Sequence, residues 1–233
     1  MKVVFMGTPA FAVPVLSALM GAGQEPVGVY TQPDKPAGRG RKPAAPPVKQ
    51  FAQERGLRVL QPTSLRPKEV EAEMSSLGPE VLVVAAYGRI IPSNILSVLP
   101  LGSLNVHPSI LPRYRGPSPV SSAILNGETV TGVTIMVIGA GVDSGPVLAH
   151  RETPVGTTET AEELTTRLFE MGASLLVEVL PAWAEGRIQA RPQDESQATL
   201  TRRLAKEDGE IAWSLSAVNI ARQVRAYHPW PGS

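Results

Sequence analysis

Two predicted strand ends carry polar side chains that could do chemistry. In the first, Asn105 and His107 stand two residues apart in an apolar segment that Pro108 ends. Side chains two apart on a strand project from the same face, so an amide and an imidazole are expected together at its tip. The second is the glycine-rich turn 138–145, which presents one acid, Asp143. If the two strand ends adjoin, the three side chains could polarise a carbonyl group and move a proton.

Each of these residues also has an ordinary interpretation. A lone histidine at a strand end is usually structural or solvated, and His150 and His228 are interpreted in that way. An aspartate in a glycine turn most often caps its own backbone. The spacing of Asn105, His107 and Asp143 therefore leaves both the catalytic and the structural interpretation open.

The elements that would position these side chains alternate between strands and helices. Apolar runs predict strands at residues 3–6, 27–31, 58–61, 81–86, 101–107 and 130–138. Helices are predicted from Pro9, with Thr8 as N-cap, to residues 21–23, and at 48–55, 67–77 and 214–227. This alternation predicts an α/β fold: a Rossmann-like, mostly parallel twisted sheet with helices on both faces.

A further helix is predicted to begin at a capping box, Thr160 followed by Glu163. Its apolar positions recur at steps of three and four, which predicts a stripe buried in the core rather than a partner surface. The stripe consists of Leu164, Leu168, Met171, Leu175 and Val179, and Pro181 is expected to kink the helix. Residues 186–210 are polar and weakly patterned, which is typical of a linker.

The segment after the first strand does not favour a nucleotide. Residues 7–12 contain Gly7 but lack the second and third glycines that let a backbone approach a pyrophosphate. No Gly-Lys-Ser/Thr motif for phosphate binding is present either. Because ligands of open α/β sheets sit beyond the carboxyl ends of the strands, the site is expected at those ends.

Composition limits the function classes. The chain has 233 residues, 42% hydrophobic and 18% charged, which predicts a packed globular core. It has no cysteine, which excludes disulfides, thiolate nucleophiles and thiolate metal sites, and no metal is expected. No apolar run is long enough to cross a bilayer, and the N-terminus lacks the pattern of a signal peptide. A cytoplasmic protein without membrane contact is therefore expected. The sequence gives no signal for an oligomer, and a monomer is taken as the default.

The loop 32–47 contains five prolines and lies in the most basic part of the chain. The net charge is only +1, yet five cations crowd this region beside a single acid, Asp34: Lys35, Arg39, Arg41, Lys42 and Lys49. Aromatic residues do not interleave with them, so base stacking is not expected and any nucleic-acid contact would be to phosphates. A solvated surface loop is the alternative.

The run NVHPSILPRYRG at residues 105–116 resembles the signature of the formyl-folate-dependent formyltransferases. Members of that superfamily carry an aspartate in a glycine turn farther along, where this chain has Asp143. Within the superfamily, several further segments resemble the branch that acts on methionyl-tRNA: residues 5–9, 31–40, 61–66, 86–92, 131–136 and 213–217. The chain departs from the usual pattern at Pro117-Ser118-Pro119 and at Pro146.

The resemblance implies roles for particular residues. It makes Asn105, His107 and Asp143 catalytic, with 10-formyltetrahydrofolate as formyl donor and initiator methionyl-tRNA as acceptor. It places folate against three segments: Tyr87, Gly88, Arg89, Ile90 and Ile91; Ser109, Ile110, Leu111 and Pro112; and Gly139, Ala140, Gly141 and Val142. It assigns contact with tRNA to the basic loop, at Lys35, Arg39, Arg41 and Lys42.

The resemblance also implies a domain plan. Residues 1–185 are expected to form the catalytic domain, and residues 186–233 a linker and terminal helix leading to a C-terminal β-barrel that this chain is expected to lack. Two alternatives remain open at this point. One is the same chemistry on a small amine such as glycinamide ribonucleotide, and the other is a catalytically silent module that binds tRNA or folate.

Overall fold

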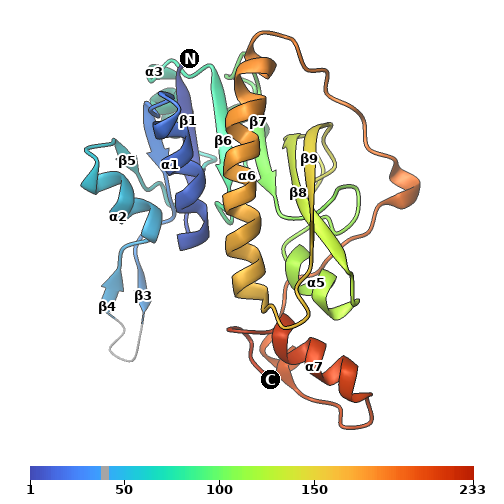
Figure 1. Cartoon of the computed structure of the whole chain (residues 1–233). Helices are drawn as coiled ribbons and strands as arrows, with labels where there is room; N and C mark the ends of the chain where they lie inside the picture. The colour runs from blue at the N-terminus through green and yellow to red at the C-terminus, as the bar shows by residue number, and fades with distance from the viewer. Residues whose placement is uncertain (38–41) are drawn as a thin grey trace. The chain divides into compact units, whose positions relative to one another are not determined.

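The computed structural model describes residues 1–37 and 42–233 (Figure 1). It divides the chain into two compact units. The first comprises Met1–Val106 and Leu176–Gln189, and the second comprises His107–Leu175 and Ala190–Ser233. Strand β7 (Ser103–His107) and helix α6 (Ala161–Ala184) each have residues in both units.

The first unit is built on parallel strands in the order β5-β2-β1-β6-β7. The bounds of its elements are β1 Val3–Gly7, η1 Ala10–Ala12, α1 Val13–Gly21, β2 Gly28–Tyr30, β3 Lys35–Ala37, β4 Lys42–Ala44, α2 Pro47–Glu54, β5 Val59–Leu60, α3 Lys68–Ser76, β6 Val81–Ala85 and α4 Ser93–Leu96. Every residue of β1 and β6, which pair along their whole length, is buried. Strands of a parallel sheet are covered on both faces, which explains why these two are continuous apolar runs.

The direction of the chain accounts for helices on both faces of this parallel sheet. From β1 to β2 to β5 the strands advance toward one edge, and from β6 to β7 they advance toward the other. Right-handed crossovers then place α1 and α2 on one face and α3 and α4 on the opposite face. Helix α1 contacts α2, and α3 contacts α4, as this arrangement requires. The expected Rossmann-like, mostly parallel α/β fold is confirmed.

The second unit combines an antiparallel strand pair with helices. Its elements are α5 Pro119–Leu125, β8 Val130–Val137, β9 Val147–Pro154, most of α6, η2 Glu195–Gln197, η3 Lys206–Gly209 and α7 Ala217–Ala226. Strands β8 and β9 pair from Val130 with Pro154 to Met136 with Val147, with one irregularity between Ile135 and Met136. Residues of α5, α6 and α7 form a hydrophobic cluster with Tyr227: Val120, Ile124, Ala161, Leu164, Leu168 and Ala226.

The capping box and the buried stripe predicted for α6 are confirmed. The Thr160 amide donates to Glu163 Oε2 at 2.9 Å and the Glu163 amide donates to Thr160 Oγ1 at 3.3 Å, which forms the capping box. Four positions of the predicted stripe are buried (Leu164, Leu168, Leu175 and Val179), and Met171 is half-buried against the cluster. The helix continues through Pro181 to Ala184.

Several boundary predictions are wrong. Thr8 does not cap a helix, because a 3-10 turn at Ala10–Ala12 comes first and α1 begins at Val13. The loop 32–47 contains an antiparallel strand pair, β3 and β4. Strand β9 and the short helices α4 and α5 were not predicted. Among the described residues, no helix combines the length and apolar character needed to span a bilayer. The domain boundary expected at residue 185 stays a prediction.

Candidate active site

Strand β7 carries the amide and the imidazole that the sequence singled out. Asn105 lies opposite Val84 of β6 in the first unit, and His107, the last residue of β7, begins the second unit. The alternation of side chains along a strand directs both to the same face. The prediction that His107 stands at the tip of a strand is confirmed.

His107 faces a carboxylate and a backbone carbonyl. Its Nδ1 lies 3.6 Å from Asp143 Oδ2, and the histidine side chain is only 5% exposed. Its Nε2 lies 3.0 Å from the carbonyl oxygen of Tyr114. A carbonyl oxygen can only accept, so Nε2 carries a hydrogen, and a hydrogen on Nδ1 would point toward the carboxylate. An imidazolium, whose two nitrogens both donate, fits these surroundings.

Asp143 is held by contacts with distant parts of the second unit. Its Oδ2 accepts a hydrogen bond from the Gly116 amide at 2.8 Å, and its carbonyl accepts one from Gln193 Nε2 at 2.9 Å. Its φ is +47°, in the left-handed region that residues other than glycine seldom occupy. The structure thus brings together two members of the predicted set, His107 and Asp143, and gives this carboxylate a contact with the loop after β7.

One threonine of β8 holds the backbone of the segment Ser109–Pro112. Thr134 Oγ1 donates to the Ser109 carbonyl at 2.7 Å and accepts from the Leu111 amide at 3.2 Å. Ser109 is fully buried and Leu111 nearly so, while Ile110 and Pro112 are half-buried. The other predicted folate segment of this unit is the turn at residues 139–142, which is more open, and Val142 is 62% exposed.

The predicted folate segment of the first unit follows β6. The Tyr87 carbonyl accepts hydrogen bonds from Thr8 Oγ1 at 3.0 Å and from Gln32 Nε2 at 2.8 Å. Gly88 has a φ of +79°, and a Cβ there would lie 2.5 Å from Gln32 Nε2, so the backbone itself requires glycine. Arg89 donates to the Pro62 and Thr63 carbonyls, while Ile90 is 90% exposed and Ile91 is half-buried.

Two of the four predicted tRNA-binding residues belong to β3 and β4. Lys35 is on β3, where Nζ donates to Gln32 Oε1 at 2.6 Å, and Lys42 begins β4. Arg39 and Arg41 lie outside the described residues. A nearby cation, Lys49, pairs with Asp34 at 2.8 Å, and this hydrogen bond, with one from Gln61, lowers the pKa of the exposed carboxylate.

Comparison with known proteins now decides the family. The formyl transferase family model matches residues 1–180, and the model of the formyl transferase C-terminal domain matches residues 203–233. The chain belongs to the formyl transferase family. The resemblance found in the sequence is thereby confirmed, and the protein is a transferase enzyme.

Relatives of this formyl transferase match along its whole length. It is 56% identical over 233 residues to a methionyl-tRNA formyltransferase of Chloroflexus aurantiacus (strain ATCC 29366 / DSM 635 / J-10-fl), covering all of this chain and 75% of that protein. It is 52% identical over 234 residues to a methionyl-tRNA formyltransferase of Roseiflexus sp. (strain RS-1), covering all of this chain and 72% of that protein.

A solved structure supports the fold. The N-formyltransferase from Helicobacter canadensis, in complex with folinic acid and dTDP-3-aminofucose, superposes with a TM-score of 0.71. The match covers 97% of this chain and 80% of the other at 19% sequence identity, so the likeness shows the fold alone. Among the described residues of this formyl transferase, no three histidine, aspartate or glutamate side chains gather where they could hold a metal ion.

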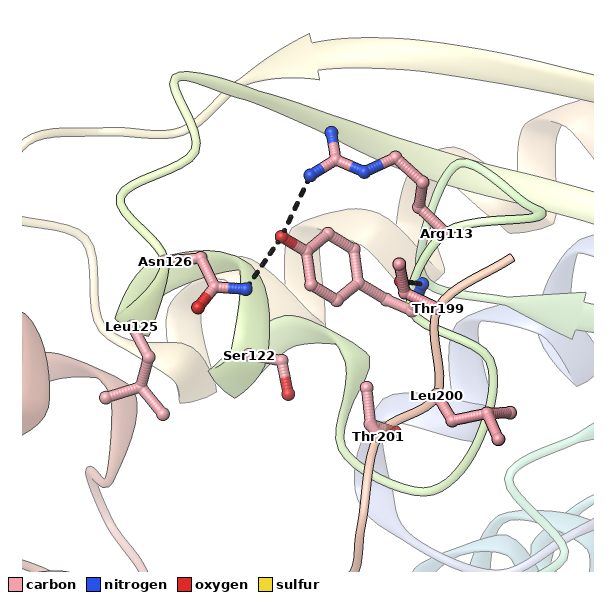
Figure 2. Close-up of a pocket in the computed structure, with 8 residues that line it drawn as sticks. Arg113, Ser122, Leu125, Asn126, Thr199, Leu200 and Thr201 are labelled. Carbon is pink, nitrogen blue, oxygen red and sulfur yellow. Dashed lines mark hydrogen bonds between the residues drawn. The ribbon is translucent and has the colours of Figure 1, made fainter. Parts of the chain in front are cut away.

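A cavity of about 220 Å³ lies within the second unit (Figure 2). Its lining consists of Arg113, Tyr114, Ser122, Leu125, Asn126, Thr199, Leu200 and Thr201, and includes neither His107 nor Asp143. The Tyr114 hydroxyl accepts hydrogen bonds from Asn126 at 3.0 Å and Arg113 at 3.2 Å, and donates to Glu128 at 2.5 Å. Tyr114 therefore faces this cavity with its phenol and His107 with its carbonyl.

Burial and hydrogen bonding set the charges of Tyr114 and Glu128. Burial, followed by the hydrogen bond to Glu128, raises the pKa of the Tyr114 phenol. Burial also opposes ionisation of Glu128, but hydrogen bonds from Tyr114 and Arg113 outweigh it and lower the pKa of that carboxyl. These contacts thus favour an ionised Glu128 beside the protonated phenol of Tyr114.

Sequence reasoning gave no role to four residues around the His107–Asp143 pair. They are Tyr114, Arg115, Gly116 and Gln193. Arg115 is 5% exposed and pairs with both carboxylate oxygens of Glu195 at 2.8 Å, a contact that raises the pKa of its guanidinium. Three of the four belong to the run at residues 105–116, which was a signal that further residues act here. Gln193, in a polar segment without periodicity, had no such signal.

Proposed function

We propose that this formyl transferase moves the formyl group of 10-formyltetrahydrofolate to the α-amino group of methionyl initiator tRNA. The proposal is carried by the His107–Asp143 pair at the end of β7 in a chain of this family. The acceptor is taken from the two relatives named above, which are called methionyl-tRNA formyltransferases and match this chain over its full length.

The reaction makes three demands on the site. The amine nitrogen attacks the formyl carbon, a C–N bond forms, and the carbonyl oxygen becomes an oxyanion. The amine then loses a proton, the bond from carbon to the folate nitrogen breaks, and that nitrogen regains a proton. The site must therefore polarise the carbonyl, stabilise the oxyanion and carry one proton between the two nitrogens.

The three side chains meet these demands in the following way. Asn105 donates from its amide to the formyl oxygen. His107 keeps its orientation because the Tyr114 carbonyl fixes Nε2, and its Nδ1 hydrogen is shared with the oxyanion. The distance of 3.6 Å from Nδ1 to Asp143 exceeds that of a hydrogen bond, which leaves the hydrogen available for this sharing. Asp143 accepts the amine proton, directly or through a water. The same proton is then passed to the departing folate nitrogen.

Folate and tRNA contacts are part of the same proposal. Folate would lie against the segments 87–91, 109–112 and 139–142, where main-chain groups and glycines allow a flat ring to approach closely. The basic loop around β3 and β4 would contact the phosphates of the acceptor stem through Lys35, Arg39, Arg41 and Lys42.

Transfer of labelled formyl from 10-formyltetrahydrofolate to methionyl initiator tRNA tests the proposal. His107→Ala should lower the rate about 10²–10³-fold, the effect of losing one oxyanion donor. His150→Ala is the matched control, because His150 is exposed on β9. Glycinamide ribonucleotide serves as a parallel acceptor. Label on that acceptor but not on tRNA would overturn the assignment of tRNA as the substrate. Full activity of His107→Ala would overturn the catalytic role of His107.

A further inference from the structure

Residues 191–201 contact both of the segments that face His107, and we name them the strap. At the start of the strap, Arg191 and Val147 exchange two backbone hydrogen bonds of 2.8 Å, close to the turn that carries Asp143. At its end, the Arg115 amide donates to the Thr199 carbonyl at 2.9 Å and the Thr201 amide donates to the Arg115 carbonyl at 2.7 Å. The strap therefore joins the Asp143 turn to the loop after β7.

One amide side chain of the strap reaches both segments. Gln193 Nε2 donates to the carbonyl of Asp143 at 2.9 Å and to the carbonyl of Gly145 at 2.7 Å. Its Oε1 accepts a hydrogen bond from Arg115 Nε at 3.0 Å. Both ends of the Gln193 amide are thus used, the donor end on the turn and the acceptor end on the loop.

The strap also reaches the backbone that holds the other nitrogen of His107. Thr199 Oγ1 accepts a hydrogen bond from the Tyr114 amide at 2.8 Å, and the carbonyl of that same residue contacts His107 Nε2. Tyr114 has a φ of +60° and Asp143 has one of +47°. Residues other than glycine keep such angles only where their surroundings impose them. The strap supplies part of those surroundings at both positions.

We propose that Gln193 is a positioning residue for formyl transfer. By holding the carbonyls of Asp143 and Gly145, its amide keeps the Asp143 carboxylate beside His107 while the amine loses its proton. This inference rests on the proposed function, because it assigns Gln193 a role through Asp143 and gives it no contact with the substrates.

The test compares Gln193→Met with Gln197→Met in the labelled-formyl assay. Gln197 belongs to the same strap and its amide donates to Asp194, away from both loops, so it is a matched control. Gln193→Met should lower kcat about 10-fold or more, since misplacing a catalytic group by ~1 Å costs up to about 10²-fold. The KM values for folate and tRNA should stay near those of the wild type. Unchanged kcat, or a rise in KM alone, would overturn the role.

Two further variants separate positioning from general loosening. Gln193→Glu retains an acceptor for Arg115 but places an anionic oxygen against the two carbonyls, so it should lose as much kcat as Gln193→Met. If Gln193→Glu is fully active, the donor end is irrelevant and the proposal is wrong. In an Asp143→Asn background, Gln193→Met should cause little further loss, because residues that act through one another are not additive. If Gln193→Met lowers kcat as much in the Asp143→Asn background as in the wild type, the positioning role of Gln193 is also contradicted.

Amide hydrogen exchange gives a readout that does not depend on activity. Gln193→Met should accelerate exchange across residues 138–146 relative to Gln197→Met, and protection equal in the two variants would overturn the proposal. If exchange accelerates but His107→Ala retains full formyl transfer, the proposed catalytic assignment fails while the Gln193 contact stands. The two failures are therefore distinguishable.

Discussion

Thr134 offers a quantitative test of how the loop after β7 is held. It is 0% exposed, and its hydroxyl satisfies both the Ser109 carbonyl and the Leu111 amide. Thr134→Val keeps the branched shape of the side chain and removes both hydrogen bonds. Two buried backbone groups then lose this partner in the folded state, although both can bind water in the unfolded chain.

The expected loss follows from these two hydrogen bonds. A buried polar group left without a partner costs about 1–3 kcal/mol, so the pair costs about 2–6 kcal/mol. The methyl group that replaces the hydroxyl recovers about 0.8 kcal/mol through its burial. The free energy of unfolding should therefore fall by about 1–5 kcal/mol. For a chain of this length each 1 kcal/mol corresponds to about 2–4 °C in Tm.

Thr31 provides the matched control. It is also 0% exposed, but among the described residues its hydroxyl has no hydrogen-bond partner. Thr31→Val should therefore leave stability unchanged or raise it slightly, by up to about 1 kcal/mol. Urea unfolding monitored by circular dichroism measures both variants. Equal destabilisation by the two substitutions would refute the reasoning, because it would show that the hydrogen bonds of the Thr134 hydroxyl contribute nothing.

Two other predictions concern charge. Replacing Arg41 and Lys42 together by alanine should weaken binding of initiator tRNA. The slope of its salt dependence should fall by about 1 for each phosphate that the variant no longer binds. The control variant Arg66→Ala with Lys68→Ala should leave both unchanged, and an unchanged slope in the first variant would argue against phosphate binding by the loop. The pKa of Glu128 is lowered from 4.5 in the folded state. Ionised Glu128 therefore stabilises the fold above about that pH, and this stabilisation is lost as the pH falls through the lower pKa of the folded state. The Tm difference between wild type and Glu128→Gln should therefore shrink below about pH 4.5, and a constant difference down to pH ~3 would contradict the linkage.

The parts of the fold that could be predicted are those with a periodic burial pattern. Strands β1 and β6 are apolar throughout because a parallel sheet covers both of their faces. Helix α6 shows a stripe with helical spacing and a capping box. Strand β9 escaped prediction because exposed and half-buried residues alternate along it with few fully buried ones, so Arg151 and Glu152 hide the pattern. Thr8 looked like a helix cap, but its hydroxyl donates instead to the carbonyl of Tyr87, 79 residues away.

The site divides in the same manner. His107 and Asp143 could be found because His107 ends a strand, Asp143 lies in the turn after one, and each stands near glycine or proline. These features are visible within a few residues of sequence. Gln193 could not be found in this way, because its three hydrogen bonds reach residues 48, 50 and 78 positions away. A contact of that kind follows from the packing of the unit and leaves no local pattern in the sequence.

The geometry around His107 is therefore a property of the folded unit. Its two ring nitrogens face Tyr114 and Asp143, which both hold left-handed backbone angles at a cost of about 1–3 kcal/mol each. Local preference alone would relax both residues and turn the carbonyl and the carboxylate away from the ring. The opposing contacts come from elsewhere in the chain: Thr199 on the Tyr114 amide, and Gly116 and Gln193 on Asp143. A perturbation of the strap should consequently reach the imidazole from both sides without touching it.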